Sequence, residues 1–107
     1  MSAFLEAIVT LLPCDAGGRS APVSPRDGSY RPFVRSAEGG PLLRVRFIEG
    51  PPTLAPGDSD RILLELETSD VGDELLFTGA ELELLERESR AVGLVTVARL
   101  WRGTLAL

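Results

Sequence analysis

The chain has 107 residues, enough for one hydrophobic core and too few for a second, so we expect a single domain. Apolar residues make up 44% of the chain, which excludes a disordered protein, and no apolar run approaches the roughly 18 residues of a membrane helix. A single cysteine excludes an internal disulfide, and residues 1–12 lack the features of a signal peptide. We therefore predict a soluble, cytoplasmic domain with no membrane association.

All 11 basic residues are arginine, and the chain contains no lysine, histidine, asparagine or glutamine. Without histidine or lysine there is no triad base, imidazole metal ligand, Schiff-base amine or phosphate-loop lysine. The formal net charge of −5 argues against a dominant phosphate-binding surface, because nucleic-acid affinity depends on clustered cations. We expect no catalytic residues, no cofactor and no metal site, and a local arginine patch stays open.

The first predicted element is a strand over residues 5–12, where Ile8, Val9 and Thr10 supply the β-branching that strands favour. Leu5, Ala7, Val9 and Leu11 would face inward and Glu6 outward. A helix is the alternative interpretation. Pro13 and the following glycine pair end the apolar run too early for an ordinary helix, which favours the strand.

A long loop from Cys14 leads into a second strand predicted over Tyr30 to Arg35. Gly17 and Gly18 can take backbone conformations that are closed to other residues, whereas each proline fixes φ and removes a hydrogen-bond donor. Such a composition leaves two alternatives, a loop that is ordered against the rest of the fold or one that has no fixed structure. The prolines and arginines of this stretch are Arg19, Pro22, Pro25, Arg26, Arg31 and Pro32.

The middle of the chain predicts two strands separated by turns. After the turn at Glu38–Pro41, Leu43, Val45 and Phe47 alternate with arginines, which is typical of a half-buried strand. Residues 55–58, Ala-Pro-Gly-Asp, place proline and glycine at the central positions of a type II turn. Residues 61–68 then alternate again, with Leu63 as the one apolar residue on the outer side.

The last third of the chain predicts a loop over residues 69–74 and two further strands. Residues 81–90 have high helix propensity, but the spacing of the neighbouring strands favours a strand here as well. Residues 91–100 form the final strand, in which Gly93 marks a bulge or close packing. Residues 101–107 are a tail, whose Trp101 either plugs the barrel or anchors a partner.

About six short strands with glycine and proline turns predict an all-β fold, and a closed antiparallel barrel would remove exposed sheet edges. We expect one domain over residues 1–107, with the barrel at about residues 3–100. Six motifs of the chain carry a resemblance to a known family: Leu5-Glu6-Ala7, Gly17-Gly18-Arg19, Pro22, Tyr30-Arg31-Pro32, Pro56-Gly57-Asp58 and Arg90-Ala91-Val92-Gly93.

In this order and spacing the motifs resemble the third, C-terminal domain of elongation factor Tu over roughly residues 3–100. The resemblance implies a six-stranded antiparallel β-barrel that is not catalytic and that contacts the nucleotide-binding domain, the tRNA T-stem and the exchange factor. The GTPase domain is absent, and no phosphate-loop motif occurs, so GTP hydrolysis by this chain is not expected.

The resemblance also implies where a macromolecule would bind. Arg19 matches the family arginine that approaches the tRNA backbone, and Glu86 falls near a family glutamate in the loop before the last strand. Ser20 and Phe33 replace a family histidine and glutamine, and Arg87 begins the segment that replaces two glycines. These departures lie on RNA-facing positions, which favours a protein partner over tRNA.

Several residues carry both a binding interpretation and a structural one. Arg19 and Arg31 would contact phosphate or an acidic partner, or would instead brace the loop through its carbonyls and nearby carboxylates. Cys14 has no neighbouring base that would activate a thiol, so we expect it to be unreactive. The carboxylates Glu81, Glu83, Glu86 and Glu88 would bind a divalent metal if they converged, but we expect them on a solvated face. Arg44, Arg46 and Arg61 would form a basic stripe on adjacent strands, but we expect them to pair with Glu65 and Glu67.

We therefore predict a non-enzymatic binding module with a protein partner, and the alternative hypothesis is a translation-related protein that binds tRNA or a translation factor. An enzyme has little support, since carboxylates such as Asp58 and Asp60 usually belong to turns. The candidate binding residues are Arg19, Ser20, Arg31, Phe33, Glu86 and Arg87.

Overall fold

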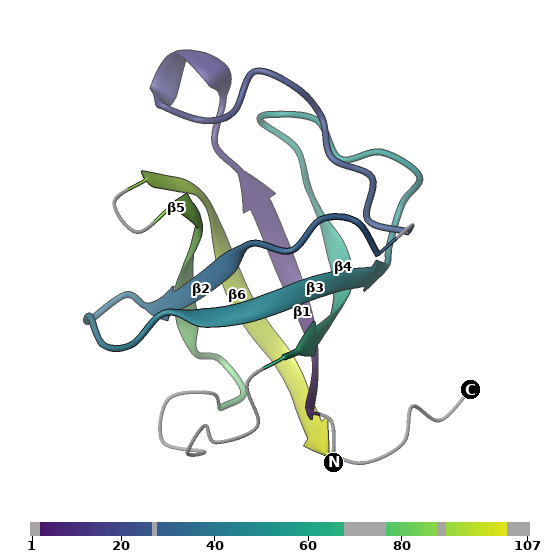
Figure 1. Cartoon of the computed structure of the whole chain (residues 1–107), viewed down its shortest axis with the longest axis vertical. Helices are drawn as coiled ribbons and strands as arrows, with labels where there is room; N and C mark the ends of the chain where they lie inside the picture. Colours follow the sequence, from purple (N-terminus) through teal and green to yellow (C-terminus); the bar gives the residue numbers. More distant parts are fainter. Residues whose placement is uncertain (1–2, 27, 68–76, 88–89, 103–107) are drawn as a thin grey trace.

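Antiparallel strands close into a barrel in the computed structural model, which describes residues 3–26, 28–67, 77–87 and 90–102 (Figure 1). Within these ranges there are six strands and one short 3-10 turn, η1, at Cys14–Ala16. The predicted all-β closed barrel is therefore confirmed. The strands are β1 (Ala3–Leu11), β2 (Phe33–Ser36), β3 (Leu43–Glu49), β4 (Ser59–Leu66), β5 (Glu81–Arg87) and β6 (Arg90–Arg102).

The strand order around the barrel is β1-β4-β3-β2-β5-β6, and β6 returns to pair with β1. Every neighbouring pair is antiparallel. The first and last strands thus complete the same sheet, so closure satisfies the backbone groups that an open sheet would leave at its edges. Figure 1 shows β1 and β6 on the wall of the barrel behind β2 and β3.

The core is formed by the inward-facing residue of each alternating pair. Leu5, Ala7, Val9 and Leu11 are fully buried, as predicted, and Glu6 faces outward. Among the described residues no polar or charged side chain is buried, so the interior is wholly apolar. The largest fully buried side chains are Phe47, Leu5, Leu11, Leu54, Ile62, Leu64, Leu82, Leu84, Leu85, Val9 and Val34.

The predicted strands are right in kind and differ from the structure at their ends; β6, for example, runs to Arg102 and so includes Trp101, which was predicted to belong to a tail. The regular part of β2 begins at Phe33, but Phe47 N–H donates to the Tyr30 carbonyl and Val45 N–H to that of Pro32. Pairing with β3 therefore starts at Tyr30. The regular ladder is interrupted at Pro32, because proline has no N–H to donate. The helix-prone segment after Glu81 is a strand, because β2 and β6 both pair with it.

Glycines serve a turn and a close approach at two predicted positions. Gly57 has φ of +91°, and Asp58 N–H donates to the Ala55 carbonyl at 2.9 Å, as a type II turn requires. At Gly93 an added Cβ would lie 2.6 Å from the Thr10 carbonyl oxygen. Gly93 therefore allows β6 to approach β1 closely, which is one of the two roles that the sequence left open.

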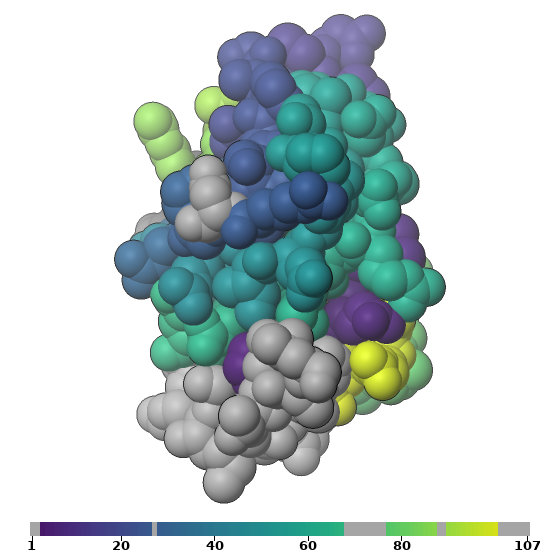
Figure 2. All heavy atoms as spheres, turned by 90° about the vertical axis from the view of Figure 1, so that its right-hand side faces the viewer, coloured from purple at the N-terminus to yellow at the C-terminus, as the bar shows by residue number. Residues whose placement is uncertain are grey.

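The loop between β1 and β2 lies across one end of the barrel. Val23 is buried and forms an isolated antiparallel bridge with Leu54, with both N–H to carbonyl bonds at 2.9 Å. Figure 2 shows the blue atoms of the loop against the teal atoms of the segment that precedes β4. Of the two alternatives for this loop, the structure therefore shows the ordered one, because the loop pairs with a second long connection.

The glycine pair shapes the start of the loop. Gly17 has φ of +89° and closes η1, where its N–H donates to the Cys14 carbonyl. A Cβ on Gly18 would lie 2.0 Å from the Leu12 carbonyl oxygen, so a side chain there would force the chain apart.

In the described ranges no helix has the length and hydropathy of a membrane span.

Candidate functional site

Arg19 and Glu86 form an ion pair that joins the long loop to the end of β5. The guanidinium Nη1 of Arg19 donates to Glu86 Oε2, and its Nε donates to the Ala21 carbonyl at 2.8 Å. The two side chains are 23% and 25% exposed, so solvent screens this pair less than an ordinary surface salt bridge. The two positions that the resemblance assigned to one surface are thus in direct contact.

Tyr30 completes this cluster from the end of the loop. Its hydroxyl donates to Glu86 Oε2 at 2.7 Å, and the Arg19 guanidinium lies over its ring, 5.2 Å from the centroid. On its inner side the ring meets Phe47 in an edge-to-face contact with centroids 4.9 Å apart. We call Arg19, Tyr30 and Glu86 the loop lock, since they fasten both ends of the loop to the barrel.

A further hydrogen bond supports the same end of the barrel. Arg90, at the start of β6, donates from Nη2 to the Gly18 carbonyl at 3.4 Å. The arginine of the loop therefore reaches the strands, and an arginine of the strands reaches the loop. This reciprocal arrangement fixes the loop in one position relative to β5 and β6.

The pKa of Tyr30 is raised above its ordinary value. The largest cause is burial of the phenol, and the second largest is its hydrogen bond to the Glu86 carboxylate. The Arg19 charge opposes this shift and is the smaller effect. The neutral phenol is the form that donates to Glu86, and the surroundings therefore favour it. Ionisation of Tyr30 would place a second negative charge beside the carboxylate and would break the lock.

The chain contains one tyrosine, so its ultraviolet titration reports on Tyr30 alone. We expect the phenolate absorbance to appear only well above pH 10, the ordinary midpoint being about 10. Because the pKa is higher in the folded state, the folded chain holds this proton more tightly than the unfolded chain does. The contribution of Tyr30 to stability is therefore fully present below about pH 10 and is lost as the pH rises above it. A midpoint near 10 in the folded protein would contradict this geometry.

A second group of residues lies on the outer face of β2 and β3. The Arg44 guanidinium stacks over the Phe33 ring, 4.2 Å from its centroid, and donates to the Arg31 carbonyl at 2.9 Å. The Arg31 side chain is 55% exposed and forms an ion pair with Glu67 at 2.9 Å. Arg31 and Phe33 are thus brought together through Arg44, in contacts that brace the end of the loop.

The remaining candidate residues stay apart from these groups. Ser20 is exposed beside Arg19, and Arg87 is exposed at the end of β5. Cys14 is a free, exposed cysteine in η1. Two of the four grouped carboxylates are used in ion pairs, Glu86 with Arg19 and Glu83 with Arg35, while Glu88 lies outside the described residues.

The predicted pairing of outward arginines with carboxylates is confirmed for Arg46, whose Nη2 lies 2.6 Å from Glu65 Oε1. For Arg61 the partner is wrong, because its Nη1 lies 2.7 Å from Glu6 Oε1 instead. Strand β4 lies between β3 and β1, so its outer side chains reach both neighbours. Glu67, the other expected acceptor, pairs with Arg31.

The net charge of the chain is carried outside the described residues. Five of the 16 acidic residues, but none of the 11 arginines, lie outside those ranges, which leaves eleven of each on the described part. The five are Asp27, Asp70, Asp73, Glu74 and Glu88. The described barrel is therefore close to neutral, with its arginines distributed over several faces.

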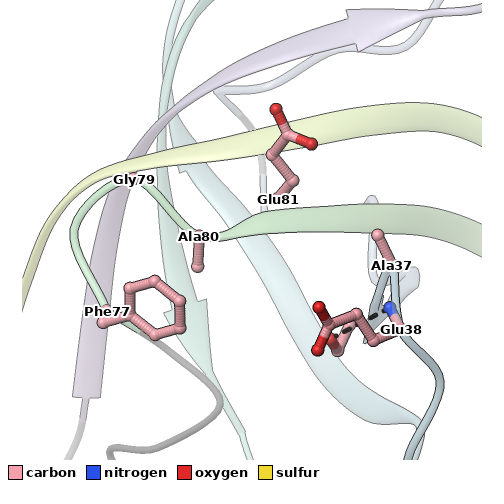
Figure 3. A pocket seen from close by; sticks show the side chains of 7 residues that line it. Ala37, Glu38, Phe77, Gly79, Ala80 and Glu81 are labelled. Carbon is pink, nitrogen blue, oxygen red and sulfur yellow. Dashed lines mark hydrogen bonds between the residues drawn. The ribbon is translucent and has the colours of Figure 1, made fainter.

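An open hollow of about 390 Å³ lies between the turn after β2 and the segment before β5 (Figure 3). Phe77, which is 56% exposed, stands on one side, and Glu38 lies on the other. The Glu81 side chain points away from Phe77. None of the sequence-predicted binding residues contributes to this hollow. Its lining residues are Ser36, Ala37, Glu38, Phe77, Gly79, Ala80 and Glu81.

Sequence reasoning missed one residue of the loop lock and one residue of the group on β2 and β3. Tyr30 was expected only at the start of the second strand, and Arg44 was expected to pair with Glu65 or Glu67. A signal for Tyr30 is its place at the start of a predicted strand, before Arg31 and Pro32. A tyrosine that is half-buried at such a position needs a hydrogen-bond partner for its phenol, which points to a polar contact there. No local pattern shows that Arg44 would stack on Phe33, since that contact depends on the β2–β3 register.

The fold and these contacts define a closed antiparallel six-stranded all-β barrel, as far as the described residues go, with a long loop locked to one end. No protein-family model matches the chain, and no curated protein sequence matches it significantly.

Proposed function

We propose that this chain is a non-enzymatic binding module, a free-standing barrel like the third domain of elongation factor Tu, which engages a protein partner in the cytoplasm. The partner would contact the loop over residues 17–32 and the surface beside it. The motif order Gly-Gly-Arg, Tyr-Arg-Pro and Pro-Gly-Asp supports the family likeness. The closed barrel is compatible with it.

The observation that carries this proposal is the loop lock. Arg19, Tyr30 and Glu86 hold the loop at both ends, while Ser20, Ala21 and Pro22 stay exposed between them. A loop that is already ordered loses little conformational entropy when it binds, which is the main advantage of a preorganised binding surface. Residues 20–22, which are exposed and uncharged in this ordered loop, suit contact with a protein surface.

The same contacts argue against the RNA alternative. The Arg19 guanidinium is engaged by Glu86, by the Ala21 carbonyl and by the Tyr30 ring. A phosphate would have to displace a carboxylate that Tyr30 also holds in place. Nucleic-acid binding depends on clustered, available cations, and the described barrel carries as many acidic residues as arginines.

The test is an affinity capture from native lysate with three matched baits: wild type, Ala21→Glu and Ala37→Glu. Both alanines are exposed, and both substitutions add the same charge, but only Ala21 lies in the loop. We expect a protein that is retained by wild type and Ala37→Glu and lost by Ala21→Glu. Equal retention by all three baits would contradict the loop as the binding surface.

The alternative has its own measurement, a filter-binding titration with aminoacyl-tRNA at about 0.05 and 0.2 M salt. Under the protein-partner proposal we expect no binding that depends on Arg19. Salt-sensitive binding that Arg19→Ala weakens, with RNA and no protein captured from lysate, would replace the proposal with the translation-related alternative.

A further inference from the structure

The outer face of β1 and β6 carries an apolar patch that none of the preceding contacts uses. Ile8 and Leu94 are 38% and 53% exposed, and with Phe77 they are the exposed large hydrophobic residues of the described chain. Each sits opposite a threonine in the β1–β6 register, Ile8 beside Thr96 and Leu94 beside Thr10. We call these four residues the β1–β6 face.

Opposite charges flank this face on its two sides. On the β4 side Ile8 is the register partner of Arg61, whose side chain is 60% exposed. On the β5 side Thr96 is the register partner of Glu81, which is also exposed. One row across β4, β1, β6 and β5 therefore consists of Arg61, Ile8, Thr96 and Glu81. It runs from a positive charge through a large apolar and a small side chain to a negative charge.

The two flanking charges differ in how they are satisfied. Arg61 pairs with Glu6, which is the less exposed member of that pair at 25%. The Glu81 carboxylate has no ion-pair partner among the described residues, and it points away from Phe77 (Figure 3). One side of the face thus presents an exposed guanidinium, and the other presents an unpaired carboxylate.

From this row we infer that the β1–β6 face binds a second copy of the same chain in a symmetric dimer. Consider a two-fold axis that runs parallel to the strands, in the plane between two such faces. The rotation exchanges the β4 side with the β5 side, so Arg61 of each copy meets Glu81 of the other. The row is complementary to itself, which is the requirement for an isologous interface.

The apolar residues follow the same symmetry. Ile8 of one copy lies over Thr96 of the other, so a large side chain meets a small one. In the next row Leu94 lies over Thr10, whose hydroxyl is already hydrogen-bonded to Ser59 at 2.6 Å. Two large and two small side chains therefore match without burying an unsatisfied hydroxyl at Thr10, as face-to-face packing of sheets requires.

This dimer goes beyond the proposed binding through the loop and does not depend on it. None of the loop-lock residues belongs to the face, so a dimer could present two loops at once. Two convex barrel walls share a small contact area, which is typical of weak association. We expect a dissociation constant on the order of 10–100 µM.

Sedimentation velocity over a concentration series tests the inference with a charge swap. We expect wild type to convert from monomer to dimer, and Arg61→Glu and Glu81→Arg each to raise the dissociation constant by about tenfold or more, since both symmetric pairs are lost. The double variant Arg61→Glu with Glu81→Arg restores opposite charges and should dimerise like wild type. Glu38→Arg, an exposed carboxylate in the turn after β2, repeats the charge change away from the face and should have no effect.

Leu94→Ser supplies a test that leaves the charges unchanged and should also abolish the dimer. Circular dichroism of each variant establishes that the barrel is folded. A wild-type chain that stays monomeric up to about 1 mM would overturn the inference, since the expected dissociation constant lies far below this. So would a dimer that Arg61→Glu, Glu81→Arg and Leu94→Ser all leave unchanged.

Discussion

Replacement of Glu86 by alanine is expected to release the long loop from the barrel and to lower the free energy of unfolding by about 2–3 kcal/mol. The carboxylate accepts hydrogen bonds from both Arg19 and Tyr30. Its loss leaves a partly buried guanidinium without its counter-charge and a half-buried phenol without an acceptor. The cost exceeds that of a surface salt bridge because both partners are about three-quarters shielded from solvent.

Urea denaturation measures the loss of stability, and hydrogen exchange of the loop amides measures the release. The matched control is Glu81→Ala, which removes an exposed glutamate from the same strand. At protein concentrations below about 5 µM, where the proposed dimer is not populated, it should change stability by no more than about 0.5 kcal/mol. If both variants lost the same stability, the lock would have no special role. Fast exchange confined to the loop in Glu86→Ala would show that the barrel itself stays intact.

Glu86→Gln separates the hydrogen bonds from the charge. The amide oxygen still accepts from Tyr30, but the negative charge that holds Arg19 is lost. We expect a stability between those of wild type and Glu86→Ala. Both substitutions should also bring the pKa of Tyr30 closer to its ordinary value, because the carboxylate raises it.

The barrel could be predicted because its strands alternate apolar and polar residues with few exceptions. In β3, for example, Leu43, Val45 and Phe47 are buried while Arg44 is exposed, as the period of two requires. The turns were equally legible, since proline followed by glycine at residues 56–57 has one favoured geometry. Helix propensity is misleading in β5, because pairing with β2 and β6 outweighs it.

The contacts between strands could not be predicted in the same way, because they depend on strand order. Arg61 was expected to pair within the region of Glu65 and Glu67, yet its partner Glu6 lies 55 residues earlier in the chain. The sequence does not state that β4 lies between β3 and β1. Register shifts add to this, since the β3–β4 alignment changes between Phe47 and Glu49.

The loop lock shows the same limit at the candidate site. The resemblance indicated that Arg19 and Glu86 belong to one surface, and they are in contact, but with each other. The two side chains are 67 residues apart, and Tyr30 joins them from a third position. Whether an arginine faces a ligand or a neighbouring carboxylate is decided by tertiary structure, and the contact between Arg19 and Glu86 favours the structural interpretation of Arg19.

Phe47→Ala should have the largest effect on stability, a loss of about 3–5 kcal/mol. Phe47 is fully buried at the centre of β3 and is the largest such side chain in the described chain. Its removal leaves a cavity beneath Tyr30, whose ring it supports. Domains of this size are stable by only about 5–15 kcal/mol, so Phe47→Leu, which leaves a smaller cavity, serves as the milder second variant.

The informative comparison is with Leu5→Ala, another fully buried residue on β1, which is not adjacent to β3 in the barrel. This control should cost about 2–5 kcal/mol through its own cavity and leave the Tyr30 titration unchanged while the protein stays folded. In Phe47→Leu, by contrast, the phenol loses part of its burial, and burial is the main cause of its raised pKa. We therefore expect its titration midpoint to move toward the ordinary value. Equal shifts of the midpoint in Phe47→Leu and Leu5→Ala would show that the Tyr30 titration responds to overall stability. The idea that Phe47 sets the pKa of Tyr30 by packing against its ring would then be wrong.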